Sequence, residues 1–343
     1  MKKAVLINDT TYDYHHGCEA VVSGIKSSLL VRGVEVIASC PVGVHYKKMN
    51  NIEKAIQQSD LIVVNGEGTI HHGREKAKWL LEVSAYAKKY NTPSVLINAT
   101  YQDNPAEFDK LLNDFDLVYV RESESYDYLK QRGIEAGFAP DLTMLLSQTI
   151  SLPEYQSRNG IGITDSPKVQ EGMWNFQMAM KHGWTFLPVL RSYRAEGEKS
   201  ATEVLRHLKH LFTNIGWINK ENGVSEESYL RARNRFLCYT VSEYLKKVSG
   251  LQILLASRFH SLCFAIVTET PFLATSGNSY KVEGLLRDVG LSSRICELSD
   301  FDDIADYNAY SFSDEEKIKI KEYKKSSLIK INNMFDKLVG LTG

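Results

Sequence analysis

The amino-acid sequence predicts an α/β protein made of two doubly wound, Rossmann-like domains that face a cleft. Short apolar segments alternate with longer segments of helical periodicity, which is typical of a parallel sheet covered by helices on both faces. The chain has 343 residues, more than one domain usually contains, so two domains are expected. A polar, turn-rich segment at Leu152–Asn159 marks the predicted boundary and gives domains of residues 1–152 and 153–343.

The elements of the first half are predicted from short apolar runs and from helix start and stop signals. Gly17 opens a helical pattern that Gly33 ends, and Ser123 is the predicted N-cap of a helix that runs to Arg132. A further helix is predicted at Ala77–Tyr90. The predicted strands are Ala4–Ile7, Val34–Ala38, Asp60–Val64, Ser94–Ala99 and Leu117–Val120.

The second half repeats the alternation. An apolar helix is predicted at Ser261–Glu269, and a Lys-rich amphipathic helix is predicted at about residues 313–338. We expect this last helix to pack on the body of the protein rather than to bind a membrane or nucleic acid. The predicted strands are Gly160–Thr164, Thr185–Val189, Ile253–Ala256 and Phe272–Thr275.

Composition narrows the class of protein. Hydrophobic residues make up 43% and charged residues 24%, and 41 Lys and Arg balance 42 Asp and Glu, which argues against a nucleic-acid partner. The five scattered cysteines form no C-x-x-C pair and suggest reduced thiols in a cytoplasm. The longest apolar stretch, Leu251–Val267, contains Arg258 and His260, so no membrane span is expected, although peripheral association stays open.

Two glycine-containing loops follow predicted strands, where ligands bind to parallel sheets. The first contains Gly17, whose helix offers free N–H groups to an anion, and the second contains Gly66 and Gly68 in the segment NGEGT. Neither loop carries a full dinucleotide or P-loop motif. A turn that requires glycine only for its backbone geometry is therefore the alternative interpretation.

Histidines stand side by side in both loops, in the tripeptides His15–Gly17 and His71–Gly73. Their proximity to Asp13, Cys18 and Glu67 raises the hypothesis of a metal site. Adjacent histidines, however, lack the spacing of a helical ligand pair. We therefore expect no metal and no cofactor, and assign the loops to hydrogen bonding and substrate contact.

Three polar residues interrupt apolar segments at places that favour an anion site. Arg258 and His260 lie where a strand passes into a helix, with Ser261 as a possible cap. Arg121 ends another apolar strand, where its planar guanidinium suits a carboxylate or phosphate. The alternatives are a structural ion pair for Arg258 and His260, and a local salt bridge with Glu122 or Glu124 for Arg121.

The order of these motifs resembles the polysaccharide pyruvyl transferase family from about residue 5 to about residue 291. Its most specific parts are the R-x-H element Arg258–His260, followed by a P-F segment, and the R-x-S element Arg121–Ser123. The other matching segments are the GEGT loop, VRESES…YLKQRG, APDLTM, SRFHSLCFAIVTETPF and SYKVEGLLRDVGL.

The resemblance implies a glycosyltransferase-B-like architecture and a reaction. The family transfers the enolpyruvyl group of phosphoenolpyruvate to a saccharide hydroxyl pair and forms a pyruvate ketal in bacterial surface polysaccharide biosynthesis. The acceptor is then a saccharide or a lipid-linked saccharide, with the first domain on the acceptor side and the second on the donor side. Many members carry an acidic residue where this chain has Cys18, and Glu19 or Asp13 is available to substitute for it.

The resemblance also implies roles for individual residues. Arg121 and Arg258 would hold the phosphate and carboxylate of the donor, and His260 would act in the chemistry; these three are the predicted catalytic residues. We add Lys281, Gly66 and Gly68 to the predicted donor site. The predicted acceptor residues are Tyr14, His15, His16, Gly17, Glu19, His71 and His72.

Two other functions remain open from the sequence. A glycosyltransferase of the same architecture would use the arginine and histidine residues to bind the phosphates of a nucleotide-activated acidic sugar. A non-catalytic binding protein would keep the cleft without turnover, and Cys18 in place of the acidic residue is the feature that leaves this hypothesis open.

Overall fold

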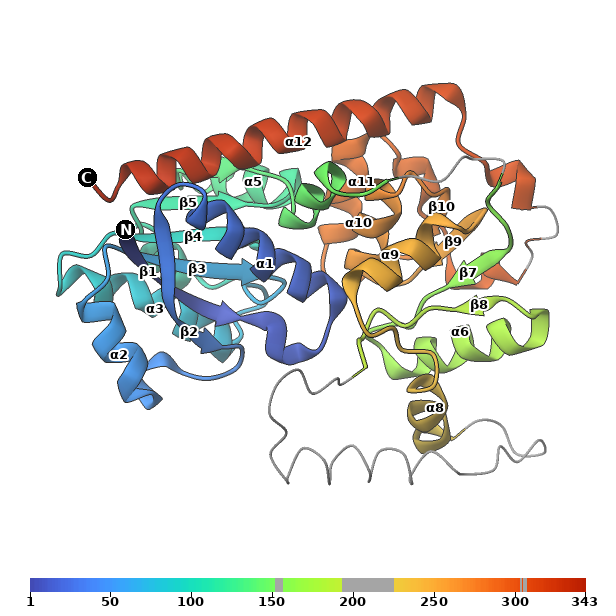
Figure 1. Cartoon of the computed structure of the whole chain (residues 1–343), viewed down its shortest axis with the longest axis horizontal. Coiled ribbons are helices and arrows are strands. Elements are labelled where there is room, and N and C mark those ends of the chain that lie inside the picture. Colours follow the sequence, from blue (N-terminus) through green and yellow to red (C-terminus); the bar gives the residue numbers. More distant parts are fainter. Residues whose placement is uncertain (152–156, 193–224, 303, 305–306) are drawn as a thin grey trace.

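The computed structural model describes residues 1–151, 157–192, 225–302, 304 and 307–343. In these residues the strands form two parallel sheets (Figure 1). The six-stranded sheet has the order β2-β1-β3-β4-β5-β6. Its strands are β1 (Lys2–Asp9), β2 (Val34–Pro41), β3 (Leu61–Glu67), β4 (Ser94–Ala99), β5 (Leu117–Val120) and β6 (Gly137–Phe138).

Helices cover both faces of this sheet, which explains why its inner strands β1, β3, β4 and β5 each contain an apolar run of three or more residues. Along β1, Leu6 packs into one hydrophobic cluster while Val5 and Ile7 pack into another on the opposite face. The helices are α1 (His16–Leu30), α2 (Asn50–Gln57), α3 (Glu75–Lys88), α4 (Ala106–Leu112) and α5 (Ser123–Gln131).

The second sheet has four described strands in the order β10-β9-β7-β8. They are β7 (Ile161–Ile163), β8 (Thr185–Phe186), β9 (Ile253–Ala256) and β10 (Phe272–Ala274). The helices of this half are α6 (Val169–His182), α8 (Glu226–Arg233), α9 (Val241–Ser249), α10 (Phe259–Val267) and α11 (Lys281–Val289).

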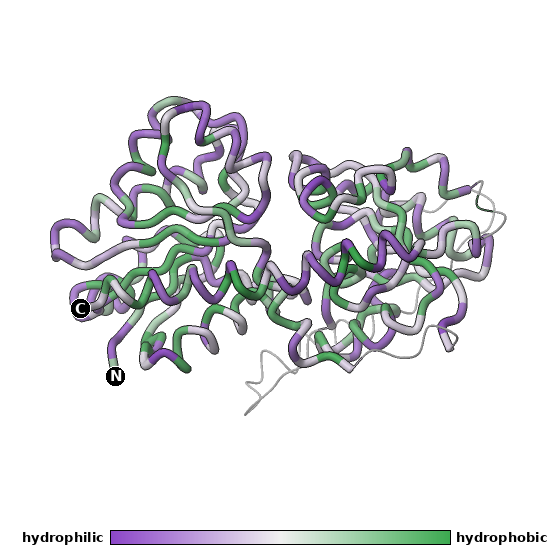
Figure 2. The backbone as a smooth tube through the Cα atoms, turned by 90° about the horizontal axis from the view of Figure 1, so that it is seen from above, coloured by the Kyte–Doolittle hydropathy of each residue, from purple (hydrophilic) through white to green (hydrophobic). Residues whose placement is uncertain are grey.

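The last helix, α12 (Asp314–Gly340), runs along both halves and ends near the N-terminus (Figures 1 and 2). A capping box between Ser313 and Glu316 starts it. Near its beginning Glu316 pairs with Arg294, and near its end Asp336 pairs with Arg32 of the first half at 2.7 Å. The helix therefore connects the two halves by contacts at each end.

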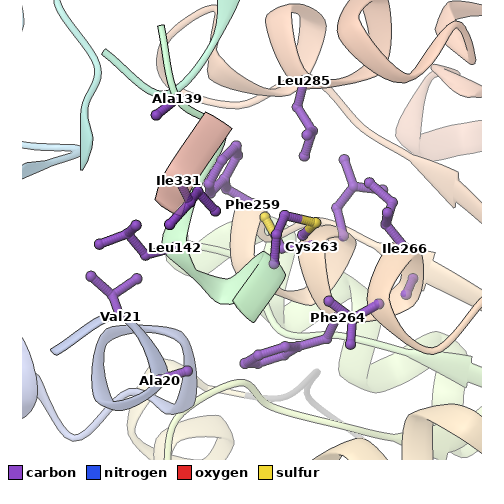
Figure 3. Close-up of a cluster of buried hydrophobic side chains, with 14 of the residues drawn as sticks. Ala20, Val21, Ala139, Leu142, Phe259, Cys263, Phe264, Ile266, Leu285 and Ile331 are labelled. Carbon is purple, nitrogen blue, oxygen red and sulfur yellow. The ribbon is translucent and has the colours of Figure 1, made fainter. Parts of the chain in front are cut away.

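A hydrophobic cluster also joins the two halves, with α10 at its centre (Figure 3). Every residue of α10 is buried, including Cys263 and Phe264. Val21 of α1 and Ile331 of α12 belong to the same cluster. Because α10 is packed on all sides, the residues at its N-terminus are held in fixed positions.

The structure confirms the predicted α/β class with parallel sheets and corrects several boundaries. The predicted strands Ser94–Ala99, Leu117–Val120 and Ile253–Ala256 are reproduced. The strand predicted at Asp60–Val64 continues to Glu67, and the one predicted to reach Val189 ends at Phe186. Both predicted caps were wrong, since Glu122 caps α5 through the Ser125 N–H and Arg258 occupies the N-cap position of α10.

Most of the predicted boundary segment, residues 152–156, lies outside the described residues, so the division at residue 152 stays a prediction. None of the described helices combines the length and apolar character that crossing a membrane requires.

Candidate functional site

The N-terminus of α10 places His260 between the two halves of the molecule. The ring is 7% exposed, and its Nε2 lies 3.7 Å from a carboxylate oxygen of Glu67 and 3.7 Å from one of Asp141. The imidazole of His15 meets it edge-on, with 5.0 Å between ring centroids. These distances bring two acids and two imidazoles together, which is a composition suited to proton transfer.

Arg121 is held beside His260 by contacts within the protein. It is 2% exposed; its Nε donates to Thr100 Oγ1 at 2.9 Å and its Nη1 donates to Asp141 at 3.0 Å. Its guanidinium lies 4.3 Å from the ring centroid of Phe259. The alternative of a local salt bridge with Glu122 or Glu124 was wrong, because the ion-pair partner is twenty residues further along the chain.

The charges around Asp141 keep its carboxylate ionised. Burial alone would raise the pKa of Asp141, but the nearby imidazole of His260 and the charge of Arg121 hold it below its usual range. Thr143 donates two further hydrogen bonds to the same carboxylate, through its N–H at 3.0 Å and its hydroxyl at 2.6 Å.

Arg258 is partly committed to a structural ion pair. Its Nη2 donates to Asp165 Oδ2 at 2.6 Å, and Asp165 is 0% exposed and accepts the Val189 N–H as well. The ion-pair alternative is thus correct for this contact, although the pairing residue lies far away in sequence. Arg258 also lines a pocket, so the pair positions its guanidinium there.

We predict that Arg258→Ala will lower the free energy of unfolding by about 3–5 kcal/mol, because the buried carboxylate of Asp165 loses its partner. Urea denaturation of the wild type and the variant measures the loss. The double variant with Asp165→Asn should recover part of it, since no charge is then left buried. Equal stability of wild type and Arg258→Ala would show that the pair does not stabilise the fold.

A small pocket of about 130 Å³ lies between these side chains, and we call it the arginine pocket. Three of the residues around it carry a positive charge: Arg121, Arg258 and Lys281. Burial, and after it the nearby charges of Arg121, Arg258 and Arg74, together lower the pKa of Lys281 to about 8. Cations that disfavour one another in a small concave space form a site that an anion would stabilise.

We predict that anion binding weakens as the pH rises through about 8, because Lys281 then loses its proton and the pocket loses one positive charge. Sulfate is a suitable probe because its own charge is constant in this range. Calorimetry should give an affinity about tenfold lower at pH 9 than at pH 7. The variant Lys281→Met should bind weakly at both values, and a steep pH dependence in that variant would contradict the assignment.

Gly68 and Gly66 serve different purposes. A Cβ on Gly68 would lie 3.4 Å from Arg121 Nη2 and 3.6 Å from Lys281 Nζ, so this glycine forms part of the pocket wall. Gly66 lies in β3, where a Cβ would be 2.5 Å from the Cβ of Ala99. It is therefore required by the packing of β3 on β4 and does not line the arginine pocket.

Glu67 is a pocket residue that the sequence did not assign to the donor or acceptor site. It has a φ of 43°, and Thr10 Oγ1 donates to its Oε1 at 2.7 Å while Cys18 Sγ lies 3.7 Å from its Oε2. Its backbone conformation is rare for a residue with a side chain and is typical of functional positions. An acid in the glycine-containing segment NGEGT, directly after the apolar run Leu61–Val64, was the signal in the sequence.

The residues predicted for the acceptor do not form one surface. His15 lines the arginine pocket and accepts a hydrogen bond from the Gly17 N–H, whereas His16 is completely buried against Tyr244. Glu19 pairs with Arg191 of the second half, whose guanidinium lies over the Tyr14 ring at 5.7 Å. His71 and His72 contact each other in the loop after β3. A direct acceptor contact therefore fits His15 better than His16.

The donor atoms of His15, Cys18 and His260 lie within 4.8 Å of one another and could hold a metal ion. A cysteine binds a metal as its thiolate. Burial raises the pKa of the Cys18 thiol well above its usual value, and the Glu67 carboxylate raises it further. The surroundings of Cys18 thus favour a protonated thiol, which opposes metal binding.

Gly17 permits the close approach of α1 to α10. A Cβ at this position would lie 2.1 Å from Cγ of His260. We predict that Gly17→Ala will displace His260 and destabilise the fold by about 1–3 kcal/mol, which thermal unfolding can measure. Gly250→Ala is the control, since its Cβ would meet only ordinary contacts at 3.6 Å. Unchanged stability of Gly17→Ala would show that the two helices separate freely.

Comparisons with known proteins agree with the motifs. The model of the family described as polysaccharide pyruvyl transferase matches residues 9–279. The comparison with curated protein sequences found no match.

Solved structures show the fold. A putative UDP-N-acetylglucosamine 2-epimerase from Listeria monocytogenes is similar, with a TM-score of 0.53, 8% identity, and coverage of 98% of this chain and 97% of that chain. An alpha-glucosyltransferase in complex with UDP is similar with a TM-score of 0.51, 12% identity, and coverage of 98% and 99%. These likenesses support the two-sheet architecture of glycosyltransferase-B proteins.

Proposed function

This chain belongs to the polysaccharide pyruvyl transferase family, and from that premise we propose that it transfers the enolpyruvyl group of phosphoenolpyruvate to a saccharide. The product is a pyruvate ketal on two hydroxyl groups of one sugar. The arginine pocket is the proposed donor site. The observation that carries this proposal is the convergence of Arg121, Arg258 and Lys281 on a pocket of about 130 Å³.

The size and charge of the pocket favour a small polyanion. Phosphoenolpyruvate carries a phosphate and a carboxylate on three carbon atoms, and its charge requires fixed cations. Arginines bind such planar or tetrahedral oxyanions through two N–H groups at once. In the described part of the chain, Nη2 of Arg121 makes no hydrogen bond, while Nε and Nη1 are both bonded, so this nitrogen is free to bind the donor.

The chemistry needs one proton donor and a stabilised leaving group. Two hydroxyl oxygens form bonds to C2 of the donor, the bond from C2 to the phosphate oxygen breaks, and C3 becomes a methyl group by gaining one proton. The two hydroxyl protons balance the reaction, one for C3 and one for the departing phosphate. His260 is the proposed acid–base residue, and Arg121, Arg258 and Lys281 stabilise the phosphate as it leaves.

Glu67 and Asp141 have a supporting role in this scheme. Both carboxylates lie 3.7 Å from Nε2 of His260, so they would stabilise the imidazolium that carries the proton. Asp141 also fixes Arg121, so one buried carboxylate orients two residues of the site.

A glycosyltransferase that uses a nucleotide-activated acidic sugar is the second candidate. Such an enzyme would have the fold that this chain adopts. It would bind the phosphates of its nucleotide sugar at Arg121, Arg258 and Lys281. The volume favours phosphoenolpyruvate, because sites for larger organic ligands usually measure about 300–1,000 Å³. A non-catalytic binding protein is the third candidate, and it differs by the absence of turnover.

Thermal unfolding with added ligands tests the donor. We expect phosphoenolpyruvate to raise the melting temperature and UDP-glucuronic acid, a nucleotide-activated acidic sugar, to leave it unchanged, because a ligand stabilises the fold that binds it. Stabilisation by UDP-glucuronic acid alone would favour the glycosyltransferase. Formation of a pyruvate ketal on any member of a saccharide panel, detected by mass spectrometry, would exclude the non-catalytic protein.

A further inference from the structure

A second and larger cavity of about 560 Å³ opens next to the arginine pocket, and we call it the Trp79 cavity. It lies beyond the carboxyl ends of β1, β2 and β3, the place where parallel sheets bind ligands. Trp79 and Lys76 of α3 form one side, and Val44 of the loop after β2 forms another. None of the seven residues predicted for the acceptor lines it.

The lining of the Trp79 cavity combines aromatic rings with charges of both signs. Asp13 and Glu75 contribute two carboxylates, and Arg74 and Lys76 contribute two cations, so these formal charges cancel. A site for phosphate alone would be mainly cationic, whereas sugar hydroxyls need both hydrogen-bond donors and acceptors. Trp79 supplies the flat apolar surface that fits the C–H face of a sugar ring.

Two cations of this cavity are available to a ligand. The side chains of Arg74 and Lys76 are exposed, line the cavity and form no ion pair within the described residues. Tyr46 lines the cavity as well, while its buried hydroxyl lies near Glu53, Glu82 and Tyr86, which do not line it. The N–H groups of Arg74 and Lys76 can therefore donate hydrogen bonds to the oxygens of a polar ligand.

The Trp79 cavity and the arginine pocket meet at Gly68, which lines both. Gly68 has no side chain to separate their contents. Asp13 lines the Trp79 cavity near the same junction. Burial raises the pKa of Asp13, the Glu67 carboxylate of the arginine pocket raises it further, and the Lys76 ammonium of the Trp79 cavity lowers it. Ligands in the two spaces would therefore touch at this point.

We propose that the Trp79 cavity binds the acceptor saccharide, with the sugar ring against Trp79 and its two reacting hydroxyls directed past Gly68 towards the arginine pocket. This inference rests on the proposed function. It assigns acceptor recognition to α3 and the loop after β2, which the sequence did not indicate.

The test measures saccharide binding and donor binding separately. The wild type is applied, with phosphoenolpyruvate present, to an array of hexose and N-acetylhexosamine oligosaccharides. Trp79→Ala and Val44→Trp should each reduce binding at least tenfold, the first by removing the flat surface and the second by filling the cavity from an exposed position. The control is Lys78→Ala, which changes the same helix at a residue that pairs with Glu107 outside the cavity and should bind as the wild type.

The affinity of each variant for phosphoenolpyruvate is measured by calorimetry and should equal that of the wild type. Binding of the donor also shows that the variant is folded. Unchanged saccharide binding in Val44→Trp and Trp79→Ala, or no saccharide binding by the wild type, would overturn the inference and leave the proposed donor intact. Saccharide binding that depends on Trp79 without any phosphoenolpyruvate binding would instead contradict the proposed donor and support the saccharide cavity.

Discussion

Replacing His260 with alanine will reduce transfer from phosphoenolpyruvate by about 10²–10⁴-fold, the usual contribution of a positioned acid–base residue. The ring stands over the arginine pocket, and its Nε2 is buried without a hydrogen-bond partner in the described residues. Two carboxylates at 3.7 Å are placed to stabilise its protonated form. His15, which also lines the pocket, is not expected to replace it, because its Nδ1 accepts the Gly17 N–H.

The variant should stay folded, since α10 is anchored along its whole length by buried apolar side chains. Steady-state rates and thermal unfolding are measured together. His182→Ala is the matched control, because it removes an imidazole that stacks on Trp184 and pairs with Asp302 far along the chain. Loss of the melting transition in His260→Ala, with normal turnover by the protein that remains folded, would show that His260 is a structural residue.

The sequence predicted the strands of the core because burial on both sheet faces leaves an unbroken apolar run. Leu117–Val120 and Ile253–Ala256 are of this kind, and both were predicted to the residue. The helices α2, α4, α6, α8, α9 and α11 and the two-residue strand β6 were not predicted. Strand β6 is too short to show a period, and most of these helices span only about two turns, whereas α6 is long enough that its period could have been recognised. The two N-caps were predicted wrongly because Ser123 and Ser261 are the residue type preferred at that position. In the structure Glu122 and Arg258, which precede them in the sequence, occupy the N-cap positions.

Some residues of the candidate site could be predicted from the sequence, whereas others are brought together only by the fold. Arg121, Arg258 and His260 could be selected from the sequence because each interrupts an apolar segment. Their partners Asp141 and Asp165 could not be paired with them, since the sequence separation of Arg258 and Asp165 is 93 residues and only the fold brings them together. The Trp79 cavity was missed because the loop that contains Gly68 meets α3 and the loops after β1 and β2 only in the fold.

Arg121→Lys will raise the phosphoenolpyruvate concentration needed for half-maximal rate by about ten- to a hundredfold, because a lost charge-assisted hydrogen bond amounts to about 1.5–3 kcal/mol. Arg121 uses two nitrogens to bind Thr100 and Asp141 and presents the third beside Gly68. A single ammonium group cannot make all three contacts. The dependence on the acceptor should change little, because this arginine contributes to binding the donor in its ground state.

Kinetics with each substrate varied in turn separate this role from a purely structural one. Arg132→Lys is the control, since Arg132 forms a partly exposed pair with Asp109 and its loss should affect stability by less than about 1 kcal/mol and kinetics not at all. The lysine at position 121 keeps a positive charge near Asp141, so the variant avoids the larger penalty of an unpaired buried carboxylate. If the response to the donor is unchanged, Arg121 serves only to neutralise Asp141, and Arg258 becomes the arginine on which donor binding must depend.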